Sequence, residues 1–142
     1  MIVEIDPGSA RTESSLRVRF CDTDLMGVVH HANYLTYFEM GRVEWLRRRG
    51  VTYNDWTARG VFLSVVEVSV RYRAPARFDD TLNVEACLIE LRTASLRFGY
   101  RLAREGELLA EGMTRLACVS RDSQPRRLPE DVVRVFLSAE RR

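Results

Sequence analysis

The chain has 142 residues, the size of one domain with its own hydrophobic core. Hydrophobic residues make up 46% and charged residues 30%, a balance that excludes a disordered chain. The formal net charge is only +2, from 22 basic and 20 acidic residues that alternate along the chain, unlike the one-sided basic patch of nucleic-acid binders. No apolar run approaches the ~20 residues of a membrane helix, and residues 1–15 hold no apolar signal core. We therefore expect a cytoplasmic protein with no membrane span and no nucleic-acid partner.

The first predicted elements are a strand and a long helix. Residues 1–13 are expected to form a loose lead-in, and alternating apolar residues and arginines at 16–20 predict a half-buried strand. The turn-forming residues 21–27 end that strand. Residues 33–49 carry apolar side chains at helical spacing, with Asn33 as the expected N-cap.

After Gly60 the sequence is typical of strands. Apolar and polar residues alternate over 66–72, 82–88, 96–102 and a last stretch that ends near Ser120. Short turns separate these stretches, which predicts antiparallel pairing rather than crossover helices. The tail predicts a short amphipathic helix over residues 129–140.

One long apolar helix beside such a sheet has to be laid across one of its faces. We therefore expect a single α+β domain over residues 1–142, with a curved antiparallel sheet wrapped around one long central helix, the hotdog fold. Gly41 lies in the middle of this helix and costs about 1 kcal/mol of helix propensity relative to Ala. Either the helix approaches the sheet closely at Gly41, or the packing does not require a glycine at this position.

Scarce residue types narrow the possible chemistry. Every basic residue is Arg, so lysine Schiff-base chemistry is excluded and anions have to be bound by guanidinium groups. Cys21, Cys87 and Cys118 stand far apart, which favours reduced, buried thiols over a disulfide scaffold. His30 and His31 are the only histidines, so zinc sites built from several histidines are excluded.

Reactive residue types are concentrated in residues 22–34, between the first strand and the helix. Asp22 and Asp24 can coordinate a divalent metal, act as nucleophile or general base, or cap turns, and their spacing leaves all three uses open. The first turn of the helix adds unpaired amide N–H groups and the positive end of a dipole, which can polarise a carbonyl oxygen. A carboxylate facing an electrophile held by those amides is the minimum equipment for acyl transfer to water.

Two motifs resemble the acyl-CoA thioesterases of the 4-hydroxybenzoyl-CoA thioesterase and YbgC group. The first spans residues 19–50, with Asp-Thr-Asp at 22–24 and Gly-Val-Val-His-His-Ala-Asn-Tyr at 27–34, and the second spans residues 72–80. The resemblance implies the hotdog fold and hydrolysis of an acyl-CoA or aroyl-CoA thioester without metal or prosthetic group. It implies that Asp24 is the nucleophile or general base. It also implies that the backbone N–H of His31 polarises the thioester oxygen, with assistance from the His31 side chain.

The resemblance further implies substrate contacts, roles for the neighbouring residues and an assembly. Asp22 is expected to fix the loop, and His30 to form part of the wall of the site. Active sites of the family lie between subunits, so we expect a homodimer or a homotetramer built as a dimer of dimers, and an open sheet edge favours association independently. The implied substrate-binding residues are Arg92, Thr93 and Ser95 for the nucleotide end of CoA, and Leu63, Ser64 and Val65 for the acyl pocket.

Three readings remain open from the sequence. Arg92 can equally be plain surface charge. The thioester can be carried by an acyl carrier protein instead of CoA. The domain can also bind acyl-CoA without turnover.

Overall fold

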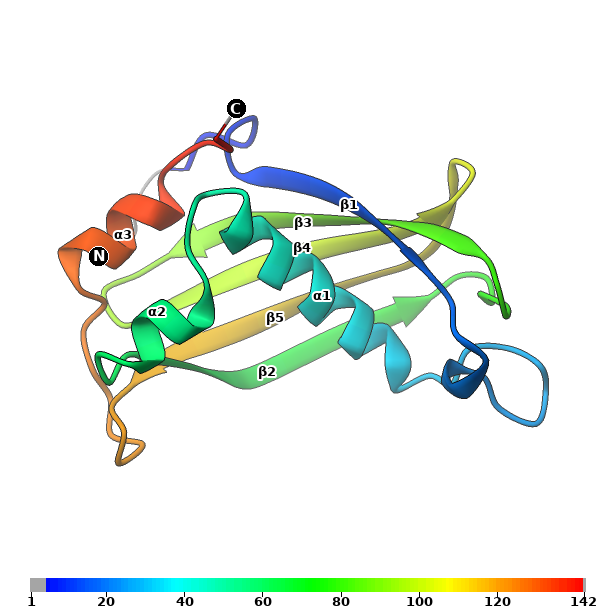
Figure 1. The fold of residues 1–142 in the computed structure, drawn as a ribbon, viewed down its shortest axis with the longest axis horizontal. Coiled ribbons are helices and arrows are strands. Elements are labelled where there is room, and N and C mark those ends of the chain that lie inside the picture. Colours follow the sequence, from blue (N-terminus) through cyan, green and yellow to red (C-terminus); the bar gives the residue numbers. More distant parts are fainter. Residues whose placement is uncertain (1–4, 142) are drawn as a thin grey trace.

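A five-stranded antiparallel sheet with one long helix laid diagonally across it forms the body of the molecule (Figure 1). The structure is a computed structural model that describes residues 5–141. It confirms the predicted α+β class and the curved sheet of the hotdog fold. The elements in chain order are β1 (Arg11–Arg17), the 3₁₀ turn η1 (Phe20–Asp22), α1 (Asn33–Arg47), α2 (Tyr53–Thr57), β2 (Phe62–Tyr72), β3 (Thr81–Leu91), β4 (Ser95–Arg104), β5 (Glu107–Val119) and α3 (Glu130–Phe136).

The strands follow the spatial order β1-β3-β4-β5-β2, and all neighbours are antiparallel. β3, β4 and β5 form the meander that their short connections predict. β2 does not lie beside β3 but pairs with β5 at the far edge of the sheet. The chain therefore has two edge strands, β1 and β2, and α1 contacts β1, β3 and β4.

The hydrophobic core lies between α1 and the sheet. Trp45 and Phe38 of α1 are fully buried in it, together with the inward-facing residues of β3 and β4. A Cβ atom on Gly41 would lie 2.6 Å from Val84 Cγ1 of β3. The helix therefore approaches the sheet closely at Gly41, which is the first of the two explanations that the sequence left open.

The N-terminal boundaries differ from the prediction. β1 begins at Arg11, inside the expected loose lead-in, because its pairing with β3 uses main-chain groups and needs no apolar alternation. The expected strand at 16–20 ends early, since Phe20 enters η1. Residues 1–4 of the lead-in lie outside the described residues.

The helices also differ in detail. α1 ends at Arg47 rather than at residue 49, and Ala32 rather than Asn33 occupies its N-cap. The short α2 was not predicted, and α3 covers only Glu130–Phe136 of the expected 129–140. Within residues 5–141 no helix is long and apolar enough to cross a membrane.

All three cysteines are free thiols. Cys118 is buried and Cys87 half-buried, as expected. Cys21 is exposed, so the expectation of buried thiols is wrong there, because η1 turns this residue out of the strand pattern.

Candidate active site

A compact loop between η1 and α1 carries the first motif. Thr23 pairs with Val29 in an antiparallel bridge, and the Asp24 N–H donates to the Val28 carbonyl at 2.9 Å. Gly27 takes a φ of 77°, a conformation that favours glycine, and closes the loop tip. The loop lies at the end of the sheet where α1 begins (Figure 1).

Asp24 is half-buried near the tip of this loop. Its Oδ1 accepts the Met26 N–H at 2.8 Å, so one carboxylate oxygen holds the local turn. Its Oδ2 accepts no hydrogen bond from residues 5–141. The side chain therefore combines a turn-forming role with an oxygen that is available to a substrate or a water molecule.

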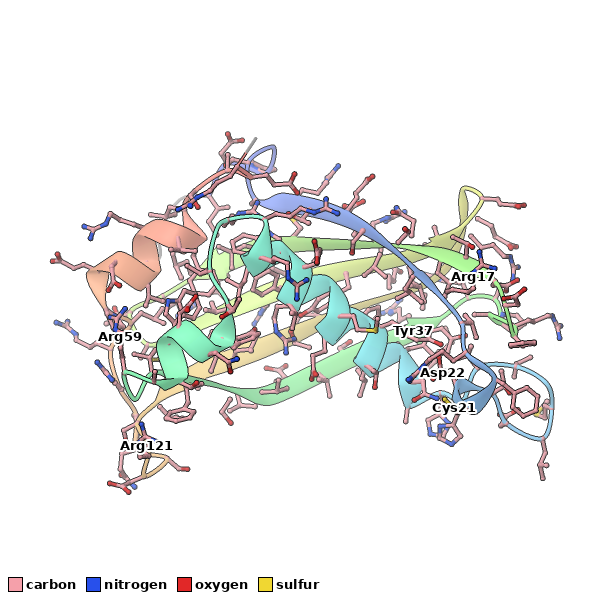
Figure 2. The ribbon with its side chains drawn as sticks, viewed as in Figure 1. Arg17, Cys21, Asp22, Tyr37, Arg59 and Arg121 are labelled. Carbon is pink, nitrogen blue, oxygen red and sulfur yellow. The ribbon has the colours of Figure 1, made fainter. Side chains whose placement is uncertain are left out.

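Asp22 is buried, and protein donors surround its carboxylate. Oδ2 accepts the Arg19 N–H at 3.0 Å and the Tyr37 hydroxyl at 2.9 Å, and Oδ1 accepts Arg19 Nη2 at 2.9 Å. Figure 2 shows Asp22 between the loop and Tyr37 of α1. Burial raises the pKa of the Asp22 carboxyl, but the hydrogen bonds from Arg19 and Tyr37 outweigh burial and leave the pKa below its usual value.

These contacts argue against a metal site at the Asp-Thr-Asp motif. Asp22 directs its oxygens at Arg19 and Tyr37, so it does not offer a ligand beside Asp24. Among residues 5–141 no group of three or more His, Cys, Asp or Glu side chains is arranged to hold a metal ion.

Four of the five amides in residues 29–33, which lead into α1, are engaged. His31 is the exception in the run 29–33, since its N–H meets no acceptor within residues 5–141. The hydroxyl of Tyr72, at the end of β2, donates to the His31 carbonyl at 2.8 Å and holds this peptide in place. The Val29 N–H donates to the Ala76 carbonyl, and the His30 N–H donates to the Asp22 carbonyl. The Ala32 N–H donates to His30 Nδ1, and the Asn33 N–H donates to the His30 carbonyl.

The two histidine side chains have different surroundings. Their rings are stacked with centroids 4.2 Å apart, and both residues are exposed. Because His30 Nδ1 accepts the Ala32 N–H at 3.1 Å, His30 caps the turn, a role that the sequence did not suggest. His31 lines a small cavity, whereas His30 does not.

This cavity of about 250 Å³ lies at the start of α1. Residues of both sequence motifs line the cavity. Those of the first motif are Val28, Val29, His31 and Tyr34, and those of the second are Tyr72, Arg73, Ala74 and Pro75. The motifs meet because Val28 pairs with Arg77 and the Val29 N–H donates to the Ala76 carbonyl at 2.8 Å. Asp24 is not among the lining residues of the single chain.

The expected substrate-binding residues lie elsewhere in the chain. Arg92 and Thr93 lie in the turn between β3 and β4, Ser95 begins β4, and Leu63–Val65 follow Phe62, the first residue of β2. These segments lie at the end of the sheet away from the start of α1 (Figure 1). Arg92 also pairs with Glu90 at 2.7 Å. A single chain therefore does not bring them to Asp24 and His31.

Sequence reasoning missed the tyrosines around the site. Tyr37 holds Asp22, Tyr72 holds the His31 carbonyl, and the Tyr34 hydroxyl accepts the Ala76 N–H at 3.1 Å. The sequence could have indicated this role, because Tyr34 and Tyr37 lie on the buried face of the helix, where the hydroxyl group of a tyrosine needs a hydrogen-bond partner.

Comparisons with known proteins identify the family of this chain. A family model described as the thioesterase-like superfamily matches residues 18–136. The acyl-CoA thioester hydrolase YbgC of Escherichia coli is 37% identical over 123 residues, covering 85% of this chain and 92% of that protein.

Solved structures have a similar fold. The hypothetical protein TT1821 from Thermus thermophilus is 46% identical, with a TM-score of 0.83 over 87% of this chain and 95% of that chain. A 4-hydroxybenzoyl CoA thioesterase complexed with 4-hydroxybenzoyl CoA is 18% identical, with a TM-score of 0.81 over 89% of this chain and 99% of that chain, and shows the fold alone. The resemblance inferred from the two motifs is confirmed. The chain belongs to the thioesterase-like superfamily and is a thioester hydrolase.

Proposed function

We propose that the enzyme hydrolyses an acyl-CoA thioester to the free acid and CoA, with Asp24 as the carboxylate and the His31 N–H as the oxyanion donor. The His31 amide carries the proposal. It is the one N–H in the run 29–33 that meets no acceptor within residues 5–141, and it lies at the positive end of α1. The acyl-CoA substrate is that named for the relatives from Escherichia coli and Haemophilus influenzae, which are 37% and 34% identical.

Two reaction routes use these groups. In the first, an Asp24 oxygen attacks the thioester carbonyl, CoA leaves as the thiolate, and water then hydrolyses the mixed anhydride. In the second, Asp24 takes a proton from a water molecule while the oxygen of that water attacks the carbonyl. Collapse of the tetrahedral intermediate then expels the CoA thiolate, which takes up a proton. In both routes the carbonyl oxygen gains negative charge that the His31 N–H stabilises. One such donor contributes about 10²–10³-fold in turnover.

A homodimer formed through β2 would complete this site. Val65, Val68 and Tyr72 of β2 are 46%, 46% and 50% exposed. Val65 and Val68 pair with the buried Leu116 and Thr114, so they share the helix-facing side of the sheet, yet both stay about half exposed among residues 5–141. An apolar face beside an unpaired strand edge favours a second copy of the chain.

The geometry of such a dimer joins the separated residues. If the two β2 strands pair antiparallel about a two-fold axis, the beginning of one strand lies beside the end of the other. Leu63–Val65 of one copy then approach Tyr72 and His31 of the other, and the turn at Arg92 moves toward the same region. A dimer of dimers extends this assembly. The free thiols fit a reducing compartment, and we place the enzyme in the cytoplasm.

The direct test measures free thiol released from a panel of acyl-CoA and aroyl-CoA substrates. We expect Asp24→Asn to lower kcat at least 100-fold, because Asn neither attacks the carbonyl nor accepts a proton from water. Asp122→Asn, in an exposed turn after β5, is the control and should leave kcat unchanged. Full activity of Asp24→Asn would refute the assigned role, and binding of acyl-CoA without thiol release would refute hydrolysis. Cleavage of acyl carrier protein thioesters alone would refute the CoA specificity.

Disruption of the β2 edge tests the dimer. Val68→Arg places a charge on the helix-facing side of β2 and should yield monomers in sedimentation experiments, with little remaining hydrolysis. Arg71→Ser, on the opposite face of the same strand, is the matched control. A wild-type monomer with full activity would contradict this assembly.

A further inference from the structure

Asp22 is the one buried acidic residue among residues 5–141, with 3% of its surface exposed. It lies two residues before Asp24 and does not line the cavity at the start of α1. Its carboxylate accepts hydrogen bonds from the Arg19 N–H at 3.0 Å, Arg19 Nη2 at 2.9 Å and Arg19 Nε at 3.5 Å, and from the Tyr37 hydroxyl at 2.9 Å. These contacts fasten the beginning of the loop to the second turn of α1.

The main chain of Asp22 makes a second set of contacts. Its carbonyl accepts the His30 N–H at 2.9 Å and Asn33 Nδ2 at 2.8 Å. His30 and Asn33 flank the turn that carries the His31 amide. One residue therefore connects the segment leading to Asp24, the turn around His31 and the body of α1.

We propose that Asp22 is a positioning residue, which sets the placement of the Asp24 carboxylate relative to the His31 N–H. The inference rests on the proposed function and assigns Asp22 no contact with the substrate. Displacement of reacting groups by about 1 Å costs about 100-fold in rate. Within residues 5–141, Asp24 itself makes only short-range bonds, to Met26, Gly27 and Val28. The long-range contacts of the loop at Val28 and Val29 lead to residues 76 and 77, between β2 and β3, and not to α1. The connection through Asp22 therefore supplies the link to the rigid helix.

The substitution Asp22→Asn tests the carboxylate with minimal change in shape. Asn keeps one acceptor oxygen but replaces the other with an NH₂ group, which has to face donors from Arg19 or Tyr37. The clash pushes the loop away from the helix without opening a cavity. We expect kcat to fall between about 10- and 100-fold while KM changes less than threefold, because the substrate loses no contact. Tyr37→Phe removes one of these donors and should lower kcat by a smaller factor.

Two control variants separate positioning from a loss of stability. Asp55→Asn removes the same kind of cap, since Asp55 Oδ2 accepts the Thr52 N–H at 2.8 Å in α2, far from the loop. Val132→Ala removes buried side-chain volume in α3 and lowers stability without contact to the site. Both should keep kcat within twofold of wild type at a temperature where all variants are folded. If Asp22→Asn also keeps kcat within twofold, the positioning role is refuted.

A double mutant distinguishes this proposal from the proposed function. If Asp22 acts through Asp24, Asp22→Asn should have less than a threefold effect on the residual activity of Asp24→Asn. An undiminished effect in that background would overturn the coupling between Asp22 and Asp24. If Asp24→Asn alone retains full activity, the proposed function fails first, whatever Asp22→Asn does.

Discussion

Replacement of Gly41 by Ala tests how closely α1 packs on the sheet. The added Cβ atom would lie 2.6 Å from Val84 Cγ1, about 1 Å inside the normal carbon–carbon contact distance. Val84 is β-branched and buried on an interior strand, so it has little freedom to move away. Overpacking of this kind costs about 1–3 kcal/mol, and the gain in helix propensity offsets about 1 kcal/mol. We expect Gly41→Ala to lower the free energy of unfolding by about 1 kcal/mol.

The same substitution should change sign when Val84 is shortened. Val84→Ala alone should cost about 2 kcal/mol, from two lost methyl groups and a small cavity. In that background the Cγ1 atom is gone, and Gly41→Ala should raise the free energy of unfolding by about 1 kcal/mol. Urea unfolding followed by circular dichroism, at one protein concentration, gives the four values of the cycle. If Gly41→Ala has the same effect in both backgrounds, close packing is not the reason for this glycine.

Three further predictions concern single residues. The pKa of Asp22 lies below its usual value in the folded state, so its stabilising contribution is present above about pH 4 and is lost as the pH falls through the folded-state pKa. In Asp22→Asn the free energy of unfolding should therefore fall less steeply on acidification than in wild type. Arg49→Met should lower the free energy of unfolding by at least about 3 kcal/mol in urea, because buried Arg49 donates to the carbonyls of Ser9 and Ser138 and covers the Trp45 ring. His31→Ala keeps the backbone N–H and should retain at least about a tenth of kcat in the thiol-release assay, whereas a larger loss would assign the main role to the imidazole.

The sequence determined the local elements and the place of the candidate site. Alternation of apolar residues located β2 to β5, and helical spacing located α1, because both patterns record which face of an element is buried. The loop before α1 was located by residue types alone, since acidic residues and glycine gathered there. Asp24 and His31 followed from that placement and from the family resemblance, and their catalytic roles remain predictions.

Only the tertiary structure decided how distant segments meet. Residues 11–15 of β1 showed no apolar alternation, because the buried position there is held by the polar Thr12, whose hydroxyl accepts a hydrogen bond from Arg49. β2 lies at the sheet edge beside β5 because strand order depends on contacts far apart in sequence. The separation of Arg92 and Leu63 from the start of α1 has the same origin. Burial of Asp22 was likewise hidden, because its donors lie at the N-cap of η1 and on α1, and a local sequence pattern does not show how those two elements pack together.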